Sequence, residues 1–503
     1  MTPATGTNDN PSGPRPNASA RVLRGTAAYA AGAVLQRAVP FLLLPFFTRI
    51  LSPSEFGQVG IITTIASGLA VIVGMGLETA VFRGYLLAEQ EDGDSARVFV
   101  NTVGGFGIVV PLLLAAAFGV FGAPLIAPPF GVPVDAVRLA GAGAGATAAA
   151  TLVPLSLLRS QERLRDYIQL TALQVVVTPV LIVLLVAVMG WGVTGWMLAY
   201  ALSSIVLLSR GLTILGHRWS LDLNAVHVRQ ALAFGIPLVP HALSHWGLAV
   251  SDRAILGAFV SAPQVGAYYV AYLFSLPVSL IAIALSQATQ PLYAEASAAD
   301  ARRIELGRIM TVQSVLIVLT AAAVALVGPS ISILLLPTNY VATATLIPWL
   351  AVGSCLFGLY LMPMAAVALV VGRTRRIWIM TVVAATANIG LNLLLVPQFG
   401  TIAAAVNTTI GYGLLLLGVF LYMRRVCNPP IPYEASRIAM GMFVVIIPSA
   451  VAAAVTTPHS ASGLVVRATV IFCVSIFLLA GPFRGEARAV MKVIRTTDAK
   501  GPA

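Results

Sequence analysis

The sequence has little charge. Only 10% of its 503 residues are Asp, Glu, Lys or Arg, whereas a soluble globular chain has about 25%. Hydrophobic residues make up 58% of the chain, and the mean hydropathy is +0.92. This composition excludes an ordinary soluble enzyme and indicates a protein that crosses a membrane many times.

Other absences narrow the function further. There are three cysteines, two of them (Cys355 and Cys473) inside apolar runs, and the sequence has no CxxC pair, so neither a disulfide framework nor a cysteine metal site is expected. No GxxxxGK[ST] phosphate loop occurs, so we expect no ATP hydrolysis. The outer loops are short and almost uncharged. We predict a protein that is not an enzyme and has no cofactor and no metal.

Long apolar stretches predict the architecture. Windows of about 20 apolar residues predict an all-α polytopic membrane protein with about fourteen transmembrane helices. The expected spans are 26–48, 57–82, 98–121, 136–158, 167–189, 193–215, 231–259, 264–292, 309–330, 343–371, 377–397, 400–422, 438–457 and 464–482.

The basic residues orient these spans. The sequence pI is about 10.1, which could indicate nucleic acid, but most Lys and Arg residues fall in short loops between apolar spans, such as 159–165 and 373–376. Basic loops of membrane proteins face the cytoplasm. We therefore expect no nucleic-acid partner, a multi-pass protein of the cell inner (cytoplasmic) membrane, and cytoplasmic termini. Residues 1–24 and 484–503 would be tails, the first of them disordered.

The sequence repeats itself. "LSPSEFGQVGIITTIASGL" (51–69) is similar to "VSAPQVGAYYVAYLFSLP" (260–277), with Gly57 matched to Gly266. "WGVTGWMLAYALSS" (191–204) is similar to "FGTIAAAVNTTIGY" (399–412) at nearly the same offset. The pattern predicts two six-helix pseudo-symmetric lobes, 25–219 and 226–425, followed by two C-terminal helices within 434–483. Because each unit has an even number of spans, the repeat is parallel, and such transporters bind substrate between the halves.

A few ionisable residues lie within or at the ends of the spans, where charge is costly and usually functional. They are Arg37, Arg49, Glu78, His241, His245, Asp252 and Arg253. Arg37 lies near the membrane midplane. At 100° per residue, His241, His245 and Asp252 share a narrow stripe on one helix, whereas Arg253 points about 100° away from Asp252.

Structural roles are the alternatives. Arg37 could bond carbonyls freed by Pro40 and Pro45, and Glu78 could pair with a basic residue at the inner edge. The histidines could bridge helices. Asp252 and Arg253 fall nearer the outer end, where a long side chain can reach water.

Three stretches carry a resemblance to a known family. "PFFTRILSPSEFGQVGI", "GMGLETAVFR" and "VSDRAILGAFVSAPQVGAYYVA" resemble polysaccharide flippases of the multidrug/oligosaccharidyl-lipid/polysaccharide exporter superfamily. The resemblance covers roughly residues 25 to 425. It implies an alternating-access transporter that flips a polyprenyl-pyrophosphate-linked oligosaccharide to the outer leaflet for cell-envelope biosynthesis. A lipid-linked saccharide and the bilayer are then the partners, with a glycan polymerase or glycosyltransferases as candidates.

On this interpretation, the substrate-binding candidates are Arg37, Arg49, Glu78, Asp252 and Arg253. Ion coupling would fall to Glu78, His241, His245 or Asp252. A drug or organic-cation antiporter of the same superfamily is the alternative, although such a protein needs carboxylates in its cavity, where this chain has Arg37. A lipid II flippase is a further alternative, which the lack of charge in 264–292 disfavours.

Overall fold

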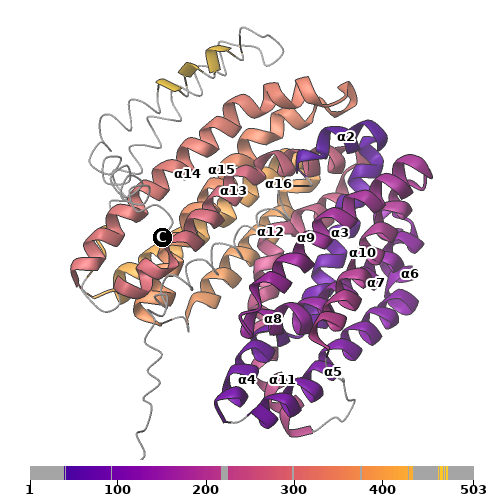
Figure 1. The fold of residues 1–503 in the computed structure, drawn as a ribbon. Helices are drawn as coiled ribbons and strands as arrows, with labels where there is room; N and C mark the ends of the chain where they lie inside the picture. Colours follow the sequence, from indigo (N-terminus) through magenta and orange to yellow (C-terminus); the bar gives the residue numbers. More distant parts are fainter. Residues whose placement is uncertain are drawn as a thin grey trace, which may run out of the picture.

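The computed structural model describes residues 39, 41–91, 93–216, 225–296, 300–373, 376–428 and 430–433, with a few more between 463 and 473. Over these ranges the chain forms helices and no strand. Figure 1 shows two groups of helices, one from α2 to α11 and one from α13 to α16, with α12 between them. The prediction of an all-α fold is confirmed.

The first lobe consists of helices connected by short turns, several of which continue into a tighter or wider helical turn. In chain order they are α2 (Leu44–Ile50), α3 (Pro53–Gly74), α4 (Leu77–Glu91), α5 (Gly93–Ala117), η1 (Phe118–Gly122), α6 (Ala123–Ile126), η2 (Pro128–Phe130), α7 (Val134–Ala150), η3 (Thr151–Leu155), α8 (Ser156–Ser160), α9 (Leu164–Ile182), η4 (Val183–Val188) and α10 (Gly192–Leu215).

From Ala225 on, the described helices are α11 (Ala225–Gly235), η5 (Ile236–Leu238), α12 (Val239–Phe259), α13 (Ala262–Ala296), α14 (Asp300–Leu335), η6 (Thr338–Tyr340), α15 (Thr343–Ala365), η7 (Ala366–Val371) and α16 (Ile377–Val426). Helix α11 packs on α4 and α5 of the first lobe, and the second lobe is built from α12 to α16. Helix α12 packs on α16 and α3, and α13 packs on α3, α14 and α15. The lobes therefore meet chiefly through α3, α12 and α13.

Among the described residues, nine helices are long and apolar enough to cross a membrane. Eight correspond to single predicted spans. The ninth, α16, joins 377–397 and 400–422 through a break at Gly400, where φ is +62°. The predicted span 231–259 is α11, η5 and α12, which is not among the nine. Most of 26–48, all of 438–457 and most of 464–482 lie outside the described residues, so the count of fourteen stays a prediction.

The two copies of the repeat begin their second helix in the same way. Ser52 caps α3 by accepting a hydrogen bond from the Glu55 backbone N–H, and the Glu55 carboxylate accepts from the Ser52 backbone N–H in return. At the matching place before α13, the Gln264 side chain accepts from the backbone N–H and hydroxyl of Ser261. In both copies the side chain three residues into the helix accepts from the capping serine, which satisfies a donor left over at a helix start, and at Ser52 the cap is reciprocal. It explains why both helices begin directly after these serines.

The matched glycines touch each other. A Cβ placed on Gly57 would lie 2.0 Å from the Ala262 carbonyl oxygen, and one on Gly266 would lie 1.9 Å from the Pro53 carbonyl oxygen. Pro53 and Ala262 are themselves related by the same 209-residue offset as Gly57 and Gly266. Such a reciprocal contact is what a two-fold axis produces. The pseudo-symmetry axis therefore passes through the α3–α13 crossing.

A second contact joins breaks in two helices. Met75 and Gly76 both have positive φ, and they separate α3 from α4. A Cβ on Gly76 would lie 2.2 Å from the carbonyl oxygen of Gly235, which ends α11. The break between α11 and α12 therefore touches the break between α3 and α4.

We expect the α3–α13 crossing to tolerate no side chain. Gly57→Ala should destabilise the protein by about 1–3 kcal/mol because the added methyl forces two backbones apart. Gly390→Ala is the matched control, since nothing lies within 4 Å of a Cβ at that position in α16, and it should be neutral or slightly stabilising. Thermal unfolding of the purified protein in detergent measures both. Equal melting temperatures for the two variants would contradict the close crossing.

Candidate functional site

Asp252 lies in the core of the second lobe. It is 2% exposed, and its Oδ2 accepts hydrogen bonds from the Tyr268 hydroxyl on α13 and the Thr408 hydroxyl on α16, the latter at 3.4 Å. Its Oδ1 accepts from the Arg253 backbone N–H at 2.8 Å. Groups from α12, α13 and α16 therefore surround the carboxylate, although the Thr408 hydroxyl also donates to the Ala404 carbonyl at 2.9 Å. Sequence position had placed it where a side chain could reach solvent, and that interpretation is wrong.

Arg253 is buried beside it, at 4% exposed. Its guanidinium lies 4.0 Å from the centroid of the Tyr272 ring and 5.2 Å from that of Tyr269. Cation–π attraction of this kind is worth about 2 kcal/mol or more when water is excluded. Its Nε and Nη2 are buried and have no hydrogen-bond partner among the described residues. The site therefore holds a shielded cation with unused donors.

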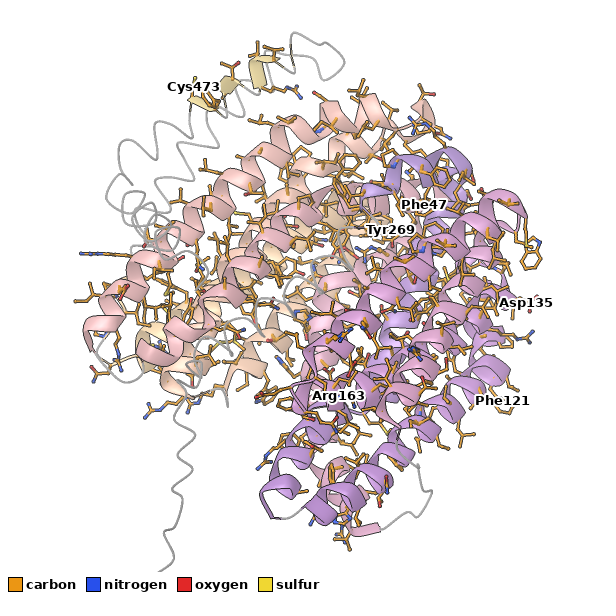
Figure 2. The ribbon with its side chains drawn as sticks, in the orientation of Figure 1. Phe47, Phe121, Asp135, Arg163, Tyr269 and Cys473 are labelled. Atoms are coloured by element: carbon orange, nitrogen blue, oxygen red, sulfur yellow. The ribbon has the colours of Figure 1, made fainter. Side chains whose placement is uncertain are left out.

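A cavity of about 310 Å³ lies on the first-lobe side of Tyr269. Phe47, Trp196, Tyr200 and Tyr269 provide aromatic walls, and its polar groups come from Thr63, Gln174 and Thr178. The cavity thus lies between α2, α3, α9, α10 and α13. Figure 2 labels Phe47 and Tyr269 in this region, where the two lobes meet.

We call Asp252, Arg253, Tyr268 and Thr408 the buried cluster. The cavity and the buried cluster occupy corresponding positions in the two lobes. Leu43 and Thr63, which line the cavity, match Asp252 and Tyr272 at an offset of 209 residues, and Tyr200 matches Thr408 at 208. The same place in the repeat is therefore hollow in the first lobe and filled by hydrogen-bonded charge in the second.

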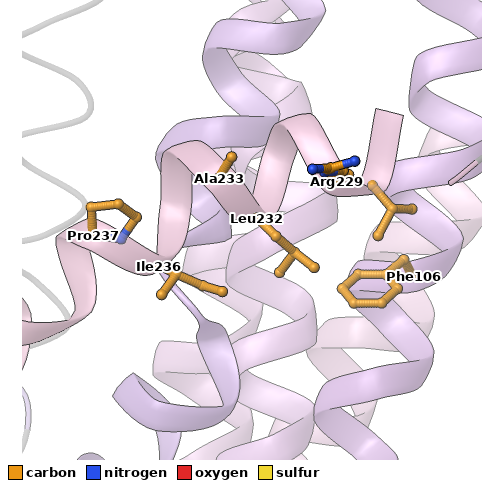
Figure 3. A pocket seen from close by; sticks show the side chains of 7 residues that line it. Phe106, Arg229, Leu232, Ala233, Ile236 and Pro237 are labelled. Carbon is orange, nitrogen blue, oxygen red and sulfur yellow. The ribbon is translucent and has the colours of Figure 1, made fainter. Parts of the chain in front are cut away.

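A second hollow is larger and more open, at about 570 Å³. Figure 3 shows that α11 and Phe106 line it, and apart from Arg229 its side chains are apolar. It offers little polar chemistry. A lining of this kind suits contact with lipid chains.

The comparisons with known proteins agree with this architecture. Residues 46–344, more than half of the chain, match the family model described as polysaccharide biosynthesis protein. The chain belongs to this family. It is a multi-pass membrane protein of a polysaccharide biosynthesis family, and its fold is shared with a lipid II flippase and a multidrug exporter.

Individual relatives of this family member are distant. The succinoglycan biosynthesis transport protein ExoT of Rhizobium meliloti (strain 1021) is 33% identical over 85 residues, which span 17% of the chain and only 16% of ExoT. Lipid II flippase MurJ in an inward closed conformation aligns with a TM-score of 0.64 at 12% identity, covering 88% of the chain and 98% of MurJ. A superfamily transporter from Pyrococcus furiosus aligns with a TM-score of 0.53 at 16% identity, covering 82% and 98%. At these identities, the two structures show the fold alone.

The other residues singled out from the sequence lie apart from the cluster. Glu78 pairs with Arg159 of α8, which is the structural alternative considered for it. Arg49 is exposed and donates a hydrogen bond to the Pro45 carbonyl at 2.8 Å. His241 is half-buried, and His245 is more exposed, with its ring 6.4 Å from that of Phe357. Arg37 lies outside the described residues.

Sequence reasoning missed Tyr268 and Thr408, the hydrogen-bond partners of Asp252. It also missed three buried asparagines that form a separate chain in α16: Asn392 donates to Asn388 at 3.2 Å, and Asn407 donates to Asn392 at 3.0 Å. They bind the two halves of α16 across its break at Gly400. Neutral amides do not appear in a search for charge. Their recurrence within apolar spans was the available signal.

We expect Asp252 to balance Arg253. Asp252→Ala should destabilise the protein by about 3–5 kcal/mol because it leaves a buried cation uncompensated. Asp252→Asn combined with Arg253→Met removes both charges and should recover most of that loss. As a control, Asp135→Ala breaks an exposed pair with Arg138 and should cost about 0–1 kcal/mol. Thermal unfolding compares the variants, and a double variant no more stable than Asp252→Ala would contradict the pairing.

Proposed function

We propose that the protein flips a polyprenyl-pyrophosphate-linked oligosaccharide from the inner to the outer leaflet of the cytoplasmic membrane by alternating access. Membership of a polysaccharide biosynthesis family and a fold shared with a lipid II flippase support a lipid-linked saccharide as cargo. The lipid tail can stay in the bilayer while the protein shields the polar head group.

One observation carries this proposal: Arg253 is a buried cation with two nitrogens that lack hydrogen-bond partners in the described part of the chain. A guanidinium is permanently charged and can bind two oxygens of a pyrophosphate at once. The rings of Tyr269 and Tyr272 lie against its guanidinium, and Tyr269 also lines the cavity. Movement of these rings would present Arg253 to a head group held there.

The remaining candidates take separate roles in the proposal. Arg37, near the midplane by its sequence position, is the second cation for the pyrophosphate. Arg49, in the last turn of α2, stays a substrate-binding candidate. Glu78 already has a cationic partner, so we assign it to packing at the basic end of the first lobe. Asp252 is the ion-coupling candidate that belongs to the cluster. His241 and His245, the other ion-coupling candidates, lie on the same helix.

The membrane potential is a sufficient energy source. Moving one charge across 100 mV is worth about 2.3 kcal/mol, so outward movement of a dianion is favoured by several kcal/mol. In this proposal the lobes are residues 25–219 and 226–425, two further helices lie within 434–483, and both termini are cytoplasmic. The two lobes rock about the α3–α13 crossing.

Removing the charge of Arg253 should stop transport. We expect the Asp252→Asn/Arg253→Met double variant to insert and fold normally but to accumulate lipid-linked saccharide at the inner leaflet. Asp252→Asn/Arg253→Lys should transport slowly because it keeps the charge but not the planar fork. Arg138→Met, at an exposed pair, is the control.

Arg37→Ala tests the second cation in the same assay and should also block flipping without loss of membrane abundance. The measurements are inner-leaflet glycan lipid, membrane abundance and melting temperature. Normal transport by a stably inserted double variant would remove Arg253 from the mechanism, and the pyrophosphate assignment with it.

The orientation can be tested independently. In a background without native cysteines, cysteines at Gly131 and Gln398 should react with an impermeant thiol reagent from outside the cell. Cysteines at Gln161 and Arg373 should react only after permeabilisation, since they lie in the basic loops. Labelling of both pairs from one side would overturn the orientation and the parallel repeat.

A further inference from the structure

The cavity between the lobes has the features of a built binding site. Trp196 is held in place by Phe47, with ring centroids 4.8 Å apart, and by Phe56 at 5.9 Å. The Tyr200 hydroxyl is hydrogen-bonded to Thr147 at 3.2 Å, and Thr147 to Ser204 at 2.9 Å. A site whose side chains are fixed before binding loses less entropy when the ligand enters.

Two of the residues that line this cavity have unused hydrogen-bond donors. Among the described residues, neither the indole N–H of Trp196 nor the hydroxyl of Thr178 makes a hydrogen bond. Aromatic faces beside free N–H and O–H groups suit a ligand that is apolar on its face and polar at its edge. A pyranose ring has this character, since its C–H face stacks on aromatic rings and its hydroxyls lie around the rim.

The volume of the cavity and the charge around it limit which ligands can bind there. Small-molecule pockets measure about 300–1,000 Å³, so a cavity of about 310 Å³ holds roughly one ring and not a whole oligosaccharide. No Asp or Glu is among the described residues that line it. Arg253 does not line the cavity but lies behind Tyr269, 5.2 Å from the centroid of its ring. A cationic drug would therefore find no counter-ion among the described lining residues and a positive charge behind the tyrosine.

We propose that this cavity binds a single uncharged sugar ring, stacked on Trp196 and hydrogen-bonded by Thr178, beside the pyrophosphate held by Arg253. The inference rests on the proposed function and deepens it, because it separates recognition of the sugar from recognition of the phosphate. The ring concerned is the one attached to the pyrophosphate. Rings further along the glycan stay outside, so specificity falls on the first sugar.

The test compares two water-soluble probes on the purified full chain in lipid nanodiscs. One probe is geranyl pyrophosphate, and the other is the same lipid linked to glucose, galactose or N-acetylglucosamine. In the wild type, at least one sugar should strengthen binding about tenfold, the scale of an aromatic stack with hydrogen bonds. Trp196→Leu should reduce that gain to less than about twofold and leave binding of geranyl pyrophosphate unchanged.

Two further variants separate the ligand contacts from packing. Thr178→Val removes only a hydroxyl from the lining and should lower the sugar gain severalfold. Trp191→Leu changes an exposed tryptophan at the start of the same helix and should leave the gain intact. Because Trp196 also packs on Phe47 and Phe56, Thr178→Val decides the question if Trp196→Leu fails to fold.

Each outcome points to a different conclusion. If geranyl pyrophosphate itself does not bind, the proposed function fails. If it binds but no sugar strengthens binding, or if the gain survives both Trp196→Leu and Thr178→Val, the sugar site is overturned while the pyrophosphate site stands. If tetraphenylphosphonium binds more tightly than every sugar probe and depends on Trp196, the cavity is a cation site and the inference is wrong.

Discussion

The close contact between Gly57 and Gly266 is the constraint on which the site depends. Since neither residue has a side chain, the backbones of α3 and α13 touch, and their relative register is fixed. With that register, Tyr269 lies against Gly60, where a Cβ would be 3.1 Å from the tyrosine ring. A residue of the second lobe thereby becomes a wall of a cavity in the first. Its neighbour Tyr268 points the other way and binds Asp252.

The cavity of the first lobe and the buried cluster of the second are two copies of one duplicated region, and their side chains differ. Positions 43, 59, 60 and 63 of the first lobe are Leu, Val, Gly and Thr, and their partners 209 residues later are Asp252, Tyr268, Tyr269 and Tyr272. The differences are coordinated, because the added carboxylate comes with the tyrosine that donates to it. At three of the four positions a tyrosine replaces a smaller residue, and at the fourth a carboxylate replaces an apolar side chain, so the second copy is filled by polar groups where the first is hollow.

The sequence was sufficient for the all-α fold and for the matching starts of α3 and α13, because these rest on local periodicity and on the residues Ser52 and Ser261. It was not sufficient for the surroundings of Asp252 and Arg253. Hydropathy gives a residue's depth along a helix, but its neighbours depend on how α12 packs between α13 and α16. Glu78 shows the same limit, since Arg159, which pairs with it, lies in a different helix.

The free-energy cost of burying Arg253 relates the α3–α13 crossing to transport. Burying a cation with unfilled hydrogen bonds is costly, and here Asp252 and two aromatic rings offset only part of that cost. A pyrophosphate would satisfy the remaining donors, but it cannot reach them while Tyr269 covers the guanidinium. Tyr269 is in turn held by the α3–α13 crossing through Gly60. On the proposed function, rocking of the lobes about this crossing moves Tyr269 and exposes the cation, which couples substrate binding to alternating access.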